Sequence, residues 1–255
     1  MKKLYFLILR KIPRPYLIIF SYFFSRITSI LYRGNNFKCP VCGGKFRKML
    51  SYGVWHEREN VLCPRCLSLE RHRLMWLYLK NKTGFFTDNL KVLHIAPEQC
   101  FRKRFKKLKN LEYTTADLVS PIADVKMDVQ DMPFKNEEFD VVICNHVFEH
   151  VPDDRKAMSE VYRVLKKEGF AIMFVPMDLS LENTFEDLTV TDPAEREKLF
   201  HQKDHLRLYG RDYTKILEQT GFVIDEKNYF DELDLFMKEH FRITEKEYMY
   251  GYKKK

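Results

Sequence analysis

The stretch that most constrains the fold is residues 139–176, where two apolar runs enclose a helical pattern. The first run, FDVVIC, leads directly into a polar cluster formed by Asn145, His146, Glu149 and His150. In the helical pattern, apolar residues recur one, three and four positions apart, and we expect this helix to end at Gly169. Polar side chains at the carboxyl end of a buried strand are typical of ligand sites in open α/β sheets.

Shorter apolar runs lie upstream of this stretch. Residues 91–97, 111–118 and 122–129 are predicted strands, and residues 101–110 form a predicted helix between the first two. Strands that alternate with helices indicate a parallel, doubly wound sheet. A chain of 255 residues can build one such domain and a small appendage. We therefore expect an α/β fold over residues 83–255.

Four cysteines in residues 37–82 have the sharpest spacing in the chain. They form two Cys-x-x-Cys pairs with twenty residues between them, Cys39 with Cys42 and Cys63 with Cys66. Two such pairs complete the tetrahedral thiolate shell that Zn²⁺ prefers, so we predict a zinc ribbon. Four protein ligands leave no open position, which indicates a structural ion. Redox motifs or disulfides are the alternative.

Residues 1–36 carry seven basic residues and no acidic residue. Their longest apolar run, residues 16–24, is shorter than the roughly 20 residues that a membrane-spanning helix needs. A helix here would gather Ser21, Ser25, Thr28 and Ser29 on one stripe. Its apolar side would then carry Ile18, Ile19, Phe23, Ile27, Ile30 and Leu31. We expect an amphipathic helix on an anionic membrane surface.

Two other interpretations of residues 1–36 stay open. One is a helix packed on the protein's own core. The other is a secretory signal, although no small-residue cleavage site follows the apolar run. With membrane attachment from the inside, we expect a cytoplasmic protein at the inner face of the cell membrane.

The polar cluster and the helix after it closely resemble the matching region of class I S-adenosylmethionine (SAM)-dependent methyltransferases, the type 11 branch in particular. The likeness covers roughly residues 90–224. It implies an enzyme with a mostly parallel, seven-stranded, Rossmann-like sheet and SAM as methyl donor. The cofactor positions it implies are Ala96, Glu98, Asp117, Asp128, Val129 and Asn145.

The resemblance gives these positions separate roles. Asp117 would accept hydrogen bonds from both ribose hydroxyls of the cofactor. Asp128 would bind the adenine amino group, with Val129 beside the ring. Asn145 would border the methyl-donor side.

The turn after the first strand departs from the family pattern. The family carries an acidic residue and Gly-x-Gly-x-Gly there, whereas residues 94–99 of this chain contain no glycine. Some family members resemble this chain in having an Ala-Pro-Glu turn, in which Glu98 could reach the cofactor's ammonium or ribose. We interpret the turn as a variant SAM site. A dehydrogenase is disfavoured because its fingerprint needs those glycines, and a non-catalytic binding module is the alternative.

Three histidines are candidate catalytic bases because the imidazole pKa lies near working pH: His146, His150 and His205. The first two flank the predicted pocket, and a purely structural role is their alternative. His205 lies in a segment that resembles the family's approach to its last helix. There Asp204, Arg207 and Tyr209 are expected at the pocket mouth, and the alternative for His205 is a helix cap.

The distribution of charge bears on the methyl acceptor. Residues 37–82 carry ten basic and three acidic residues, and the rest of the chain after them is net acidic. A basic, membrane-seeking front favours a small-molecule, glycan or lipid-linked envelope precursor as acceptor. RNA is the alternative, since zinc ribbons joined to this fold also occur in ribosomal RNA enzymes.

Overall fold

A computed structural model describes residues 14–53, 57–224, 228–243 and 249–254 of the chain. The chain divides into two compact units. The first comprises residues 1–83 and 232–247, and the second comprises residues 84–231 and 248–255. The first thirteen residues of the predicted membrane segment lie outside the described residues.

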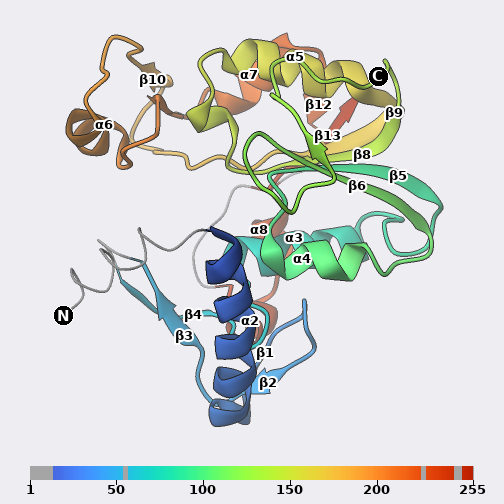
Figure 1. Cartoon of the computed structure of the whole chain (residues 1–255), viewed down its shortest axis with the longest axis vertical. Helices are drawn as coiled ribbons and strands as arrows, with labels where there is room; N and C mark the ends of the chain where they lie inside the picture. The colour runs from blue at the N-terminus through green and yellow to red at the C-terminus, as the bar shows by residue number, and fades with distance from the viewer. Residues whose placement is uncertain (1–13, 54–56, 225–227, 244–248, 255) are drawn as a thin grey trace. The chain divides into compact units, whose positions relative to one another are not determined.

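The second unit is built on a seven-stranded sheet of order β12-β13-β9-β8-β5-β6-β7 (Figure 1). The strands are β5 (Leu90–Ile95), β6 (Leu111–Asp117), β7 (Val125–Lys126), β8 (Phe139–Cys144), β9 (Leu165–Ile172), β12 (Phe222–Ile224) and β13 (Tyr252–Lys254). Strand β13 pairs antiparallel with both of its neighbours, and β5 to β9 pair in parallel. This confirms the predicted mostly parallel α/β sheet.

The strand order reverses between β5 and β8. From β5 the chain continues to β6 and β7 on one side, and then returns to β8 on the other side. Crossover connections therefore leave β5 and β8 in opposite directions. In an open sheet this is the place where a crevice forms at the carboxyl ends of the strands.

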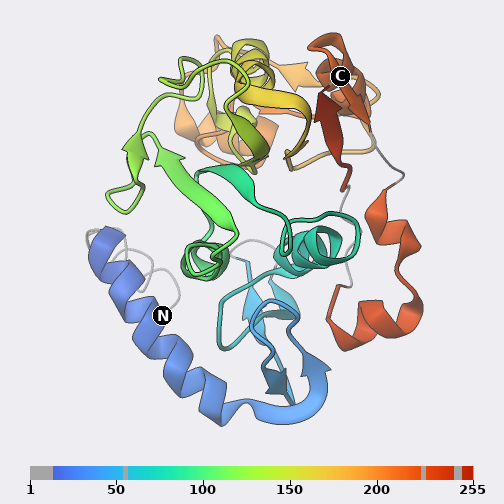
Figure 2. The same ribbon diagram turned by 90° about the vertical axis from the view of Figure 1, so that its right-hand side faces the viewer.

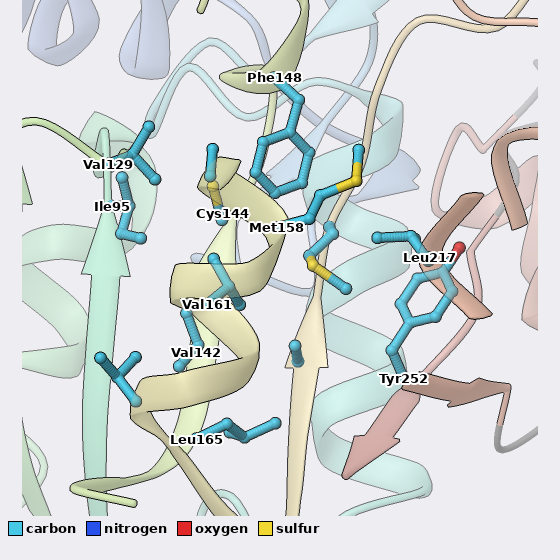
Figure 3. Packing of buried hydrophobic residues seen from close by; sticks show 14 of the residues in the cluster. Ile95, Val129, Val142, Cys144, Phe148, Met158, Val161, Leu165, Leu217 and Tyr252 are labelled. Atoms are coloured by element: carbon cyan, nitrogen blue, oxygen red, sulfur yellow. The ribbon is translucent and has the colours of Figure 1, made fainter. Parts of the chain in front are cut away.

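Helices cover both faces of the sheet, with α5 and α7 on one face and α4 on the other (Figure 1). The helices of this unit are α4 (Gln99–Phe105), η1 (Phe148–His150), α5 (Asp154–Val164), α6 (Pro193–Phe200) and α7 (Tyr213–Gln219), and α8 (Tyr229–Glu232) spans the division between the units. A short pair, β10 (Phe185–Glu186) with β11 (Arg207–Leu208), completes it. Asp153 caps α5 by accepting from the Lys156 amide. Met158 and Val161 of this helix pack on Val142 and Leu217 (Figure 3).

The prediction that Gly169 ends the helix is wrong. Helix α5 ends at Val164, and Gly169 lies inside β9. The register between β8 and β9 shifts between Phe139 and Val141, so β9 contains a bulge. A Cβ on Gly169 would lie 2.9 Å from the Asp140 carbonyl oxygen. The glycine therefore permits close approach of two strands.

Two predicted elements are shorter than expected. Helix α4 ends at Phe105 instead of residue 110, and the strand predicted over 122–129 is reduced to Val125–Lys126. The carboxylate of Asp124 accepts from the amide and the hydroxyl of Thr115, at 3.1 and 2.7 Å. The Asp124 side chain thus binds Thr115 of β6 where a longer β7 would have supplied backbone hydrogen bonds.

The first unit contains two short antiparallel pairs and three helices among its described residues: α2 (Arg14–Leu31), β1 (Arg33–Lys38), β2 (Lys45–Phe46), β3 (Leu50–Tyr52), β4 (Arg58–Leu62), α3 (Glu70–Asn81) and α9 (Leu235–His240). At the start of α3, Glu70, His72 and Arg73 are buried, and Arg73 donates to the Val61 and Ser68 carbonyls at 2.9 and 2.8 Å.

Helix α2, the long blue helix in Figure 2, buries two of its hydroxyl-bearing side chains. Ser25 and Thr28 are buried, and Thr28 donates to the Pro64 carbonyl at 2.6 Å. The opposite, apolar side is exposed, with Phe23 at 62% and Ile30 at 75% of full exposure. Within the described chain, the polar side of α2 therefore faces the protein and its apolar side is uncovered.

None of the helices in the described ranges combines the length and the apolar character that crossing a membrane requires.

We expect Glu160→Gln to lower the free energy of unfolding by about 2 kcal/mol at pH 7. Glu160 accepts from the Met132 amide at 2.8 Å and from Arg163 at 2.6 Å, and Arg163 in turn holds the Phe134 carbonyl at 2.7 Å. The Arg163 hydrogen bond keeps the pKa of Glu160 below its ordinary value of 4.5.

The folded-state pKa of Glu160 is depressed. Its contribution to the free energy of unfolding is therefore present above pH 4.5 and is lost as the pH falls through the folded pKa. The difference between wild type and variant should therefore shrink below pH 4.5. Urea unfolding across pH 3–8 measures this difference, with exposed Glu218→Gln as the control. A difference that is the same at all pH values would contradict the assignment.

Candidate functional site

The carboxyl ends of β5, β6 and β8 meet at one edge of the sheet, since Ile95 pairs with Ala116 on one side and with Cys144 on the other. Three predicted cofactor residues gather at this edge. Ala96 directly follows β5, Asp117 ends β6, and Asn145 directly follows β8.

The glycine-free turn after β5 has a left-handed backbone at Ala96, with φ at +48°. This is a conformation that glycine adopts more readily than other residues. The Ala96 amide still donates to the Ala116 carbonyl at 2.8 Å, so the sheet continues into the turn. The turn thus keeps a backbone shape suited to glycine while carrying only a methyl side chain.

Glu98 joins the two strands that flank the reversal point. Its Oε2 lies 2.6 Å from His94 Nε2, and its Oε1 accepts from the side-chain amide of Asn145 at 2.9 Å. The Asn145 side-chain oxygen in turn accepts from the Phe174 amide at 3.1 Å. Both carboxylate oxygens of Glu98 therefore have partners inside the protein, and they fix the orientation of Asn145.

His94 and Tyr113 complete this chain of hydrogen bonds, and the sequence interpretation missed both as site residues. His94 is fully buried, and its Nδ1 lies 2.8 Å from the Tyr113 hydroxyl. Burial and the Glu98 charge raise the pKa of Tyr113, so its hydroxyl remains a donor. His94 Nδ1 then accepts from Tyr113, while Nε2–H donates to Glu98. The sequence did carry one indication of this site, a histidine within the apolar run KVLHI.

Asp117 and Asp128 differ in how they are held. Asp117 Oδ1 accepts from the Val119 and Ser120 amides at 2.8 and 2.7 Å, and within the described residues its Oδ2 remains available to a ligand. Asp128 is exposed, and Gln130 contacts both of its oxygens. Val129 is buried in the apolar core beside Ile95 (Figure 3).

The three candidate histidines lie close to Glu149, which is almost completely buried. His146, in a left-handed backbone conformation, has its Nδ1 3.3 Å from Glu149 Oε1. The rings of His150 and His205 lie edge to face with centroids 4.8 Å apart. The fold therefore brings His205 close to a segment that lies 55 or more positions earlier in the chain.

His205 is buried, and its Nδ1 lies 3.1 Å from the carbonyl of Phe200, the last residue of α6. Burial lowers the pKa of His205, which favours the neutral imidazole at neutral pH. Its neighbours differ from the prediction. Arg207 and Tyr209 are buried instead of lining a pocket mouth, because Arg207 donates to the Val151 carbonyl and Tyr209 donates to Asp154.

In the first unit, the four predicted metal ligands converge. Their sulfur atoms lie within 4.8 Å of one another, with Cys39 and Cys66 3.6 Å apart and Cys42 and Cys63 3.7 Å apart. A tetrahedral ion with Zn–S bonds of about 2.3 Å would separate its sulfurs by about 3.8 Å. The cluster is therefore compatible with a shared metal ion.

Charge at this cluster also fits metal binding. Burial acts to raise the pKa of Cys39, but hydrogen bonds from the other three thiols and the charge of Arg73 bring the pKa well below its ordinary value. Hydrogen bonds to Cys39 and burial raise the pKa of the other three thiols, so without an ion the negative charge gathers on Cys39. Arg73 is itself fully buried. A guanidinium beside the cluster can offset part of the negative charge of four thiolates.

Comparison with known proteins shows which domains part of the chain resembles. Residues 82–173 match the type 11 methyltransferase domain family. The chain is 26% identical over 162 residues to 2-methyl-6-phytyl-1,4-hydroquinone methyltransferase 1 of Oryza sativa. This alignment covers 58% of this chain and 46% of that protein. It is 33% identical over 69 residues to an uncharacterized methyltransferase of Bacillus subtilis, covering 26% of this chain and 27% of that protein. These matches agree with the predicted enzyme class, because residues 82–173 resemble a methyltransferase domain.

Among solved structures, a SAM-dependent methyltransferase of Mesorhizobium loti is similar over 72% of this chain and 98% of its own length, with 13% identity and a TM-score of 0.49. The chain spans about half the length of the curated hydroquinone methyltransferases that it matches.

Proposed function

We propose that the chain transfers the methyl group of SAM to a lipid-linked acceptor at a membrane surface. The observation that carries this proposal is the joint placement of Ala96, Asp117 and Asn145 at the reversal point of a methyltransferase-type sheet. When bound, SAM supplies an activated methyl group whose transfer requires donor and acceptor to be held in line.

Each residue at the edge has a role in this proposal. Asp117 binds the ribose hydroxyls through Oδ2, and Asp128 binds the adenine amino group at the surface. Asn145 borders the methyl-donor side, and Glu98 holds it there through their 2.9 Å hydrogen bond. Glu98 thus acts as a positioning residue as well as a polar wall of the site.

His146 is the proposed base for an acceptor hydroxyl. Its Nδ1 lies 3.3 Å from Glu149 Oε1, and in the proposal Nδ1 carries the proton and Nε2 the lone pair. Within the described residues that Nε2 is buried and lacks a hydrogen-bond partner. When His146 takes a proton from the acceptor, the Glu149 carboxylate lies beside the imidazolium that forms.

Helix α2 supports a membrane-borne acceptor. Its exposed side carries Tyr16, Phe20, Phe23, Phe24, Ile27, Ile30 and Leu31. At the C-terminal end of this helix, the first unit has a cavity of about 700 Å³ whose lining includes Arg33, Lys45 and Arg65. Apolar side chains next to cations match an anionic lipid surface. The names of the relatives that act on a prenylated hydroquinone agree with an apolar acceptor.

The four-cysteine cluster is proposed to hold a structural Zn²⁺. Four thiolates fill a tetrahedral shell, so this ion would organise the short strands of the first unit and take no part in methyl transfer. Small strand pairs such as β1–β2 and β3–β4 bury little apolar surface and need such a crosslink.

Asp117→Ala is expected to weaken SAM binding at least 30-fold, because a carboxylate bonded to two hydroxyls contributes about 2 kcal/mol or more. Calorimetric titration of the full chain with SAM measures this. Glu112→Ala is the matched control, since Glu112 lies at the opposite end of the same strand with a 71% exposed side chain.

Transfer of labelled methyl from SAM into a membrane lipid extract then tests the acceptor class. Label that partitions into organic solvent supports the proposal, and label that is instead incorporated into RNA would replace it with the nucleic-acid alternative. Equal SAM affinity of wild type and Asp117→Ala would contradict the cofactor site itself.

Replacing Phe23 and Ile30 together by glutamine should reduce binding to anionic vesicles about a hundredfold or more, because two apolar side chains of about 1.5–3 kcal/mol each would no longer insert. Co-sedimentation with phosphatidylglycerol vesicles measures the bound fraction. Leu188→Gln removes one exposed apolar side chain from the second unit and serves as the control. Unchanged sedimentation of the double variant would exclude α2 as the membrane contact.

Cys63→Ser should lose the bound Zn²⁺ and lower the melting temperature of the first unit, since metal binding contributes directly to folding of such sites. Metal analysis and circular dichroism of the full chain report both effects. Cys100→Ala, at a buried thiol outside the cluster, should keep the ion. Zinc retained in Cys63→Ser would show that the cluster is not the ligand set.

A further inference from the structure

A second group of potential metal ligands lies in the second unit, outside the cysteine cluster. Glu149, His150 and His205 each place one ligand atom within 4.8 Å of the others. A shared ion with bonds of 2.0–2.2 Å would need these atoms roughly 3.0–3.4 Å apart.

The orientation of both imidazoles is set by backbone carbonyls. His205 Nδ1 lies 3.1 Å from the Phe200 oxygen, and His150 Nδ1 lies 3.2 Å from the Asp204 oxygen. A carbonyl oxygen only accepts, so each Nδ1 carries the proton and each Nε2 keeps its lone pair. Metal-binding histidines are commonly held in this way, with the second nitrogen donating to a carbonyl.

Glu149 supplies independent support for a cation. Its side chain is 1% exposed, and within the described residues its Oε2 has no hydrogen-bond partner. A buried carboxylate oxygen without a donor is costly. Its other oxygen has His146 Nδ1 at 3.3 Å. A cation beside Oε2 would satisfy the remaining oxygen of the carboxylate.

The backbone around these residues is firmly tied. The Leu206 amide donates to the Glu149 carbonyl at 2.8 Å. This hydrogen bond connects the segment that carries His205 to η1. Arg207, fully buried, donates to the Val151 and Pro152 carbonyls at 2.6 and 3.0 Å. The three ligands therefore come from two segments whose relative position is fixed by several hydrogen bonds.

We infer that Glu149, His150 and His205 form a binding site for a divalent transition-metal ion. Two imidazoles and one carboxylate suit Zn²⁺, Mn²⁺ or Fe²⁺ better than Mg²⁺ or Ca²⁺, which prefer oxygen ligands. Three protein ligands leave coordination positions for water or for an oxygen of another molecule. The side chain of His150 is 34% exposed and gives the ion a route from solvent.

Equilibrium dialysis of the full chain against Zn²⁺, with metal counted by mass spectrometry, tests this site. We expect wild type to bind one Zn²⁺ more per chain than Glu149→Gln or His205→Ala. The control is His201→Asn, at an exposed residue with positive φ, which should bind as many ions as wild type. Comparing variants with wild type keeps the test independent of whether the cysteine cluster holds its own ion.

His150→Ala is the variant least prone to misfold, because the His150 side chain is partly exposed. Circular dichroism verifies that this variant folds. Loss of one ion in this folded variant supports the site. Equal zinc content in wild type and all three variants, with each folded, would overturn it. Since the readout is metal content, the result does not depend on SAM binding or on the identity of the acceptor.

Discussion

Parallel pairing of β5 with β8 is the constraint on which the rest of the second unit depends. Four consecutive residue pairs, from Val92 with Val141 to Ile95 with Cys144, join the strands at the point where the order of the sheet reverses. Glu98 then ties the two strand ends together through His94 and Asn145. Because this contact is made of partly buried, charge-assisted hydrogen bonds, it gives the edge a fixed geometry.

A buried arginine in each unit donates to several backbone carbonyls. In the first unit Arg73 donates to the carbonyls of Val61, Ser68 and Arg242. In the second unit Arg207 binds the carbonyls that follow η1 and pairs with Glu186. Guanidinium groups suit this role because their several donors can satisfy several carbonyl oxygens at once. Irregular backbone next to the cysteine cluster and next to Glu149 is held in the same way.

Patterns with a strong local cause could be predicted from the sequence. The apolar run of β8, the spacing of apolar residues in α5 and the cysteine pairs each depend on neighbours close in the chain, and each reappears in the structure. Glu98 bonded to Asn145 could not be predicted, since it depends on how two strands pair across 47 residues.

Other features were misread because tertiary contacts override local signals. Gly169 resembles a helix stop but permits a bulge between strands. Residues 232–247 cluster with the first unit, for which the sequence carries no signal. The positions of the site residues followed from a family resemblance, and their contacts came from the fold.

The central claim is that SAM binds at the carboxyl ends of β5, β6 and β8. A crystal structure of the full chain with S-adenosylhomocysteine tests it most directly. The account predicts ligand density at this edge, with the ribose hydroxyls within hydrogen-bonding distance of Asp117 Oδ2 and Glu98 still bonded to Asn145. Density at any other place on the chain, or a well-ordered edge without ligand at saturating concentration, would contradict it.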